Sequence, residues 1–171
     1  QWGMVLIAVT IVGWLIFKFL RPKRKREWRN SGILGAFIIA RYAEMYGFPL
    51  TIYLLTSVFG QKLGIDLSHN SGHIFESLLG IKGDPHFSLF HIASNLLVGA
   101  GFILISLSWK VLYEAVKTQK IAQTGPYKII RHPQYLGFSL IILGFLLQWP
   151  TIITAVMAPF LFWRYFRLAQ D

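Results

Sequence analysis

A short polar segment between two apolar stretches carries the residue types best suited to hold a cofactor. It runs from Gly125 to Gly137 and reads GPYKIIRHPQYLG. Arg131 can hold a carboxylate or a phosphate through two parallel hydrogen bonds, and His132 can donate or accept one. Pro133 suits the first position of a helix, whose free N–H groups and positive end would point back toward the segment. This pattern predicts a site for a cofactor with an anionic end and a flat ring.

Two tyrosines and two glycines add to this prediction. Tyr127 and Tyr135 offer aromatic faces and hydroxyl groups, while Gly125 and Gly137 permit a close approach of the backbone. The segment also has a purely structural interpretation, in which a capped helix begins at a lipid surface and its long side chains reach toward water. Reasoning from the residues alone leaves both interpretations open.

Two ionisable residues lie within an apolar stretch near the middle of the first half. Arg41 and Glu44 are three positions apart and therefore share one face of a helix. Ionisable residues at membrane depth indicate function by default, so both are candidate catalytic residues. The alternative is a structural pair that neutralises itself, or a position close to the interface. Pro49, which follows, is expected to kink this helix.

A third group has the residue types of a metal site. Asp66, His69, His73 and Glu76 recur at helical intervals of three and four, which could place them on one face. They belong to a polar region, 60–86, that is expected to be an outer loop holding a short helix. Polar side chains in such loops are ordinarily solvated, so we predict no metal site.

The composition indicates an all-α, polytopic integral membrane protein. Hydrophobic residues make up 54% of the 171 residues and charged residues only 14%, against about 25% charged in soluble proteins. The chain suits one domain, and it has no cysteine, which excludes disulfides, thiolate metal ligands and a cysteine nucleophile. About five transmembrane helices are expected, the last two as a hairpin. The apolar stretches are 2–20, 33–59, 87–109 (with a helix running on to Lys117), 136–147 and 152–166.

The net charge of +10 is concentrated at two places. One is a basic loop at 20–30, and the other is the polar segment with the C-terminus. Basic loops face the cytoplasm, so the N-terminus is predicted outside and the polar segment inside. This distribution argues for anionic lipid as the partner and against nucleic acid.

The segment resembles the isoprenylcysteine carboxyl methyltransferase family and the related bacterial phospholipid methyltransferases. The resemblance rests on Gly125-Pro126-Tyr127 and on Arg131 to Gly137, and it covers about 117–171. Residues 30–60, with AEMYGFPLT at 43–51, resemble a bacterial branch of that family. It implies a methyltransferase of the bacterial inner membrane that uses S-adenosylmethionine on the cytoplasmic side. The methyl acceptor is then lipophilic, such as an isoprenylcysteine carboxylate or another lipid.

The resemblance also assigns roles to single residues. The cofactor would be held by Gln123, Gly125, Tyr127, Arg131, His132, Pro133, Tyr135 and Asp171. Arg167 matches an arginine of the family and could hold an acceptor carboxylate, whereas an amine or phenol acceptor would need a base, for which Glu44 or His132 are the candidates. The family usually continues with a glutamate-rich segment that closes the site. The sequence stops at Asp171, so either it ends within that segment, as we expect, or the closing segment is missing.

Two other functions fit parts of the pattern. Membrane sterol and steroid reductases end in a similar Arg-His-Pro element that binds NADPH, but they usually place Asn before the tyrosine and an acidic residue after the glycine. Here those positions hold Gln134 and Phe138, which favours the methyltransferase. The other alternative is a non-enzymatic membrane scaffold whose basic loop binds lipid head groups.

Overall fold

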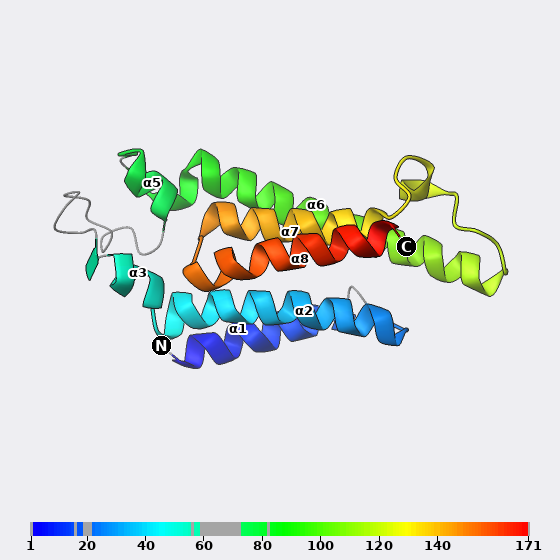
Figure 1. Ribbon diagram of the computed structural model, residues 1–171, viewed down its shortest axis with the longest axis horizontal. Helices are drawn as coiled ribbons and strands as arrows, with labels where there is room; N and C mark the ends of the chain where they lie inside the picture. Colours follow the sequence, from blue (N-terminus) through cyan, green and yellow to red (C-terminus); the bar gives the residue numbers. More distant parts are fainter. Residues whose placement is uncertain are drawn as a thin grey trace.

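Every regular element of the described chain is helical, which confirms the predicted class. The computed structural model describes residues 2–15, 17–18, 22–55, 57–58, 73–81 and 83–170. The long helices are α1 (Trp2–Leu15), α2 (Lys25–Tyr42), α6 (Leu89–Lys117), α7 (Pro133–Gln148) and α8 (Ile152–Gln170). They run side by side as an elongated bundle (Figure 1). Shorter elements are a π-helical turn (Ala43–Gly47), α3 (Leu50–Leu55), α5 (Ile74–Leu78) and 3₁₀ turns at Pro85–Phe87 and Gly125–Lys128.

Helices α6 and α7 form the closest pair of the bundle because glycines line their contact. A Cβ placed on Gly137 would lie 2.9 Å from the carbonyl oxygen of Gly101, and one on Gly101 would lie 2.7 Å from that of Gly137. Gly144 meets the Ser94 carbonyl oxygen in the same way, at 2.9 Å. Small residues at such contacts let two helices approach closely. Gly137, expected to make room for a cofactor, instead makes room for α6.

The predicted C-terminal hairpin is present. α7 ends at Gln148, Trp149 to Thr151 form the connection, and α8 begins at Ile152. The two helices are joined by stacked rings: the centroids of Phe138 and Tyr165 are 5.1 Å apart. This stack belongs to a buried core that α2, α6, α7 and α8 share.

Helix α2 begins inside the basic stretch, where a loop over 20–30 was expected. Its first residue is Lys25, so only the part before it is non-helical among the described residues. Glu27 Oε2 accepts hydrogen bonds from the backbone N–H groups of Lys23 (2.9 Å) and Arg24 (3.1 Å). These are donors that a helix start leaves without intrahelical partners. One carboxylate therefore starts a helix among basic residues.

The second apolar stretch is interrupted at the predicted proline. α2 passes into the π-helical turn, which ends at Gly47, and Phe48 is extended with φ −113° and ψ 104°. The residue before a proline avoids the helical region, because the proline ring would clash with it. Pro49 thus ends the helix where a kink was expected, and the short α3 follows.

Two described helices, α6 and α8, are long and apolar enough to cross a membrane. α1 and α7 are apolar but shorter. Few residues of the two long helices are buried, and large side chains such as Ile103 (62% exposed) and Phe160 (69%) lie on their surfaces. Exposed apolar surface of this kind is typical of contact with lipid. A set of five spans and the orientation of the chain stay predictions. About half of the expected outer loop, residues 60–72 and 82, lies outside the described residues.

Candidate functional site

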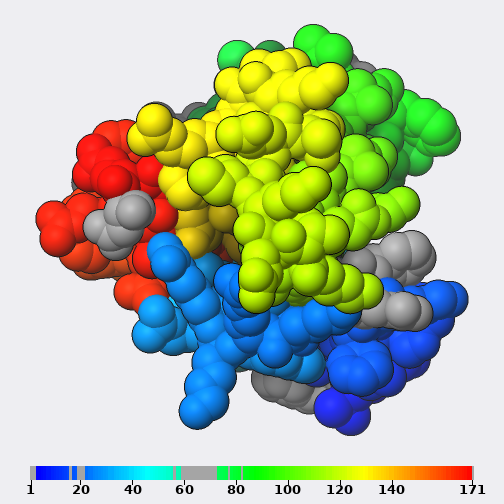
Figure 2. All heavy atoms as spheres, turned by 90° about the vertical axis from the view of Figure 1, so that its right-hand side faces the viewer, coloured from blue at the N-terminus to red at the C-terminus, as the bar shows by residue number. Residues whose placement is uncertain are grey.

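A cavity of about 790 Å³ lies at one end of the bundle, where α2 begins, α6 ends and α7 begins. Its walls come from three places: residues 24–30 of α2, residues 109–122 of α6 and the segment after it, and residues 127–138 of the polar segment and α7. Figure 2 looks onto this end and shows the hollow between these three parts. The volume falls within the range of about 300–1,000 Å³ that small-molecule sites occupy.

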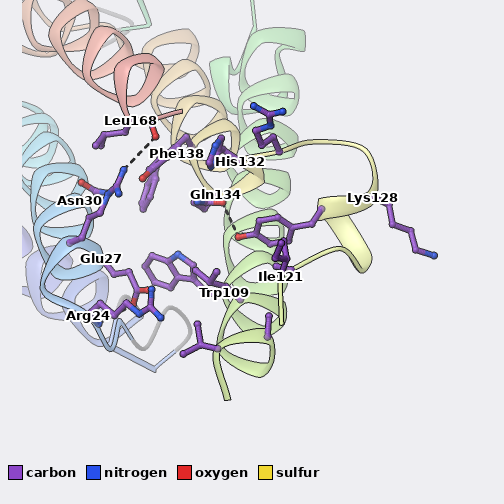
Figure 3. Close-up of a pocket in the computed structure, with 18 of the residues that line it drawn as sticks. Arg24, Glu27, Asn30, Trp109, Ile121, Lys128, His132, Gln134, Phe138 and Leu168 are labelled. Atoms are coloured by element: carbon purple, nitrogen blue, oxygen red, sulfur yellow. Dashed lines mark hydrogen bonds between the residues drawn. The ribbon is translucent and has the colours of Figure 1, made fainter. Parts of the chain in front are cut away.

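The polar segment forms one wall. Gly125 has a left-handed backbone (φ +58°), which begins the 3₁₀ turn that brings Tyr127 to the cavity. The Tyr127 hydroxyl donates to Gln134 Oε1 at 3.0 Å, a bond drawn in Figure 3. Burial raises the pKa of Tyr127 to about 12, so this hydroxyl keeps its proton at neutral pH.

Helix α7 begins at Pro133, as predicted, with His132 as the residue before its first turn. Partial burial lowers the pKa of His132, and the nearby Arg131 and Arg26 charges act in the same direction. The ring is therefore neutral at neutral pH and offers one donor and one acceptor. Arg131 is exposed at the rim of the same cavity.

A second, mostly apolar cavity of about 700 Å³ lies between α7 and α8. Arg131, His132 and Tyr135 line both cavities, so they separate one from the other. The remaining lining residues include Leu136, Phe162, Trp163 and Phe166. Several of these side chains are exposed on the outer surface of the bundle, among them Phe166 at 64%. The second cavity is therefore open toward the region that lipid would occupy.

The wall opposite the polar segment comes from α2 and was not predicted. Figure 3 shows Glu27 and Asn30 there, across the cavity from His132 and Gln134, with Trp109 between the two sides. Glu27 is 7% exposed and Asn30 3% exposed. A weak signal was present in the sequence, because Glu27 is the only acidic residue before Glu44 and lies within a basic run.

The Glu27 carboxylate is used on one side only. Its Oε2 accepts from two backbone N–H groups and from the Tyr113 hydroxyl of α6, at 2.5 Å. Its Oε1 and the Asn30 Oδ1 are buried and have no hydrogen-bond partner in the described part of the chain. Buried acceptors without donors are rare in folded proteins. Here both belong to residues that line the cavity.

The structure brings half of the predicted cofactor residues to this cavity. Tyr127, Arg131, His132 and Tyr135 line it. Gly125 and Pro133 shape the backbone nearby without lining it. Gln123 is exposed and is not among the lining residues, and Asp171 lies outside the described residues.

The three predicted catalytic residues lie elsewhere. Arg167 is exposed on α8, with its guanidinium 5.5 Å above the Trp163 ring, which lines the second cavity. Arg41 donates from Nη2 to Gln148 Oε1 at 2.7 Å. Gln148 ends α7, whose 16 residues place it about 24 Å from His132 at 1.5 Å per residue. Glu44 accepts from the Thr51 backbone N–H at 2.5 Å, near the same far end.

The described part of the expected polar outer region, 73–81 and 83–86, lies at the same far end as Arg41. The ring centroids of His73, His86 and His91 lie 5.2–5.6 Å apart in pairs. No group of three or more metal-ligating side chains is arranged to hold an ion among the described residues. Asp66 and His69, the other two members of the predicted spacing, lie outside those residues.

The comparison with known families decides between the interpretations of the polar segment. Residues 88–171 match the model of the isoprenylcysteine carboxyl methyltransferase family. Through this C-terminal half, the chain belongs to that family. The match runs from the start of α6 to the end of the chain and so includes the polar segment, while the α2 wall lies outside it. No curated protein and no solved structure matches the chain.

Membership of the isoprenylcysteine carboxyl methyltransferase family confirms the resemblance and indicates a membrane methyltransferase. It gives no support to a reductase or a scaffold. Both cavities are built mainly from α6, α7, α8 and the segment between α6 and α7, all of which lie within the matched region.

Proposed function

We propose that this protein is an S-adenosylmethionine-dependent methyltransferase of a membrane and that it methylates a lipophilic acceptor. The observation that carries the proposal is the pair of adjoining cavities that share Arg131, His132 and Tyr135. The first cavity contains most of the charged and polar side chains, and the second is mostly apolar. Two reactants of opposite character could thus meet at one wall.

The first cavity suits the cofactor in three respects. Cationic side chains for a carboxylate lie around it, namely Arg24, Arg26, Lys120 and Arg131. Aromatic rings for a flat base come from Trp109 and Tyr127, and buried acceptors for its amino and hydroxyl groups come from α2. The residues present therefore fit the group that the family implies.

The bound cofactor would supply an electrophilic methyl group, so the protein has little bond chemistry of its own to perform. Its residues would instead align the reactants and exclude water. Tyr135, 7% exposed, packs against Tyr165 and keeps the shared wall rigid, with ring centroids 6.1 Å apart. His132, neutral at neutral pH, could accept a proton from an acceptor that must lose one.

The second cavity suits a lipophilic acceptor, such as an isoprenylcysteine carboxylate or another lipid. Phe162 and Phe166 face it from α8, and burying such side chains against an acyl or isoprenyl chain is favourable by about 25 cal/mol per Å². Arg167 beside Trp163 could hold an acceptor carboxylate at its edge. The basic residues around the first cavity support a cytoplasmic position for this end, because basic segments tend to face the cytoplasm.

Calorimetric titration of detergent-purified protein with S-adenosylhomocysteine tests the proposal. We expect saturable binding, weakened about tenfold or more in His132→Ala through loss of a cavity-lining hydrogen-bonding group. Glu114→Gln is the control, because Glu114 is exposed on α6 and does not line the cavity. No binding of S-adenosylhomocysteine, or binding of NADPH in its place, would overturn the proposal.

A further inference from the structure

We infer that Glu27 and Asn30 form a binding site for a primary ammonium group, an inference that rests on the proposed function of the cavity. Both residues are on α2, outside the region that matches the family. They are three positions apart, which places them on one face of the helix. That face forms the wall opposite the polar segment (Figure 3).

The arrangement of the Glu27 carboxylate points to a ligand rather than to a structural role alone. Its Oε2 already satisfies the start of α2 and the Tyr113 hydroxyl. Those three bonds hold the carboxyl plane in place and leave Oε1 without a donor. A carboxylate fixed in this way is ready for a second partner, because the cost of ordering its side chain is met on folding.

The chemistry of the two free atoms defines the class of partner. Both Glu27 Oε1 and Asn30 Oδ1 are acceptors, so the partner must donate hydrogen bonds. The formal charge of a carboxylate selects a cation over a neutral donor. No ion pair joins Glu27 to Arg24 or Arg26 in the described part of the chain, although both line the same cavity. A primary ammonium carries three donors and could satisfy both atoms at once.

A metal ion fits this pair less well. One carboxylate oxygen and one amide oxygen are few ligands for a hard cation, which takes six or more. The described residues also hold no group of three metal-ligating side chains arranged around an ion. The cationic rim of the cavity would repel a metal ion, whereas a zwitterionic ligand would place its carboxylate at the rim and its ammonium at the α2 wall.

Two reactants of the proposed reaction could supply the ammonium. One is the amino-acid end of the cofactor. The other is an amine acceptor such as the ethanolamine head group of a phospholipid. Glu27→Gln separates the two, because it keeps an acceptor oxygen for the helix start and removes the charge that selects a cation.

The first arm of the test compares S-adenosylhomocysteine with its deamino analogue, which lacks only the α-ammonium. If the cofactor is the source, Glu27→Gln weakens binding of S-adenosylhomocysteine about ten- to a hundredfold and leaves the analogue unchanged. Asn30→Ala weakens the same ligand less, because it removes a neutral acceptor. Glu114→Gln is the matched control, since Glu114 is exposed on α6 and does not line the cavity.

The second arm measures methylation of phosphatidylethanolamine and of a farnesylcysteine derivative in vesicles. If the acceptor is the source, Glu27→Gln leaves the affinity for S-adenosylhomocysteine unchanged and raises KM for the amine lipid alone. Thermal unfolding of each variant shows whether it is folded. If Glu27→Gln is not folded, Asn30→Ala carries both arms.

The inference is overturned by equal affinity of wild type and Glu27→Gln for S-adenosylhomocysteine when methylation of the amine lipid is also absent or unchanged. An equal loss with S-adenosylhomocysteine and its deamino analogue overturns it as well, because a structural role alone would give that result. Neither outcome contradicts the proposed function, which fails only if the wild-type protein does not bind S-adenosylhomocysteine.

Discussion

Both ends of the bundle hold buried polar residues but use them differently. At the cavity end, the free acceptors of Glu27 and Asn30 belong to residues that line an open space. At the far end, the polar groups bond to one another: Arg41 reaches Gln148, and Gln148 reaches the His91 ring, both at 2.7 Å. Figure 1 shows these ends separated by the length of α7.

The difference lies in where the unsatisfied atoms face. Glu44 and Glu76 also keep one buried oxygen without a donor, but neither lines the two cavities described above. Their other oxygens accept from the Thr51 backbone N–H and from the Ser88 hydroxyl. Burial of an ionisable residue is therefore a poor guide to a binding site by itself. A buried acceptor that faces a cavity is a better one.

The largest effect is expected from a matched pair of glycine substitutions on α7. Gly137→Ala and Gly144→Ala each place a Cβ 2.9 Å from a carbonyl oxygen of α6, and each should cost about 3 kcal/mol of stability through overpacking. Only Gly137 lies near the cavity. We expect S-adenosylhomocysteine binding to be lost in Gly137→Ala and kept in Gly144→Ala, measured by calorimetry below the unfolding temperature. Loss of binding in both variants would mean that the two ends are mechanically coupled, and full binding in Gly137→Ala would contradict the prediction.

Removing the central cation of the far end should affect stability without affecting binding. Arg41→Met keeps the length of the side chain but leaves Gln148 Oε1 without its donor. A hydrogen bond to a charged group contributes about 2 kcal/mol, which corresponds to a fall of roughly 5 °C in the unfolding temperature. A loss of S-adenosylhomocysteine binding in the folded variant would contradict the separation of the two ends and return Arg41 to the active site.

A smaller effect is expected at the cavity wall. Tyr127→Phe removes the hydroxyl that holds Gln134, a bond of 3.0 Å. We expect the affinity for S-adenosylhomocysteine to fall about fivefold, as one neutral hydrogen bond contributes about 1 kcal/mol. Thermal unfolding should hardly change, because Gln134 is only partly buried. A large loss of stability would instead mark Tyr127 as part of the core.

The smallest effect is a pH dependence of stability from the far end. Burial lowers the pKa of His73, and the neighbouring His91, His86 and Arg41 add to this while Glu76 opposes it. The unfolded residue then binds a proton at a higher pH, about 6.5, than the folded one. Stability should therefore be intact above that pH and fall as the pH drops from there to the folded-state pKa. Thermal unfolding of wild type and His73→Gln between pH 8 and 5 checks this, and parallel curves would contradict it.

Local features of the fold were readable from the sequence because short-range rules produce them. Pro133 begins α7, and Pro49 ends a helix, because the proline ring fixes its own backbone and restricts the residue before it. The turn through Trp149 and Pro150 was readable for the same reason. Length and hydropathy predicted α6, including its continuation to Lys117. The family resemblance was equally local, since it rests on one contiguous motif.

The partners of that motif could not be read in the same way. Arg41 and Glu44 satisfied the sequence criterion for a functional pair, yet α2 carries them to the far end, and Arg41 bonds to Gln148 rather than to Glu44. Glu27 looked like one acid among basic residues. Only the packing of α2 beside α8 and its hydrogen bond from Tyr113 of α6 brought it to the cavity. Gly137 meets α6 for the same reason.

The sequence by itself determined where α6, α7 and α8 begin, and it determined the chemical character of the polar segment. Backbone sterics and apolar length act over a few neighbouring residues, so a contiguous stretch of sequence is enough to predict their effect. Only the tertiary structure decided which helix faces meet. That choice depends on packing among residues far apart in the chain, such as Asn30 and Tyr165, whose contact joins α2 to α8.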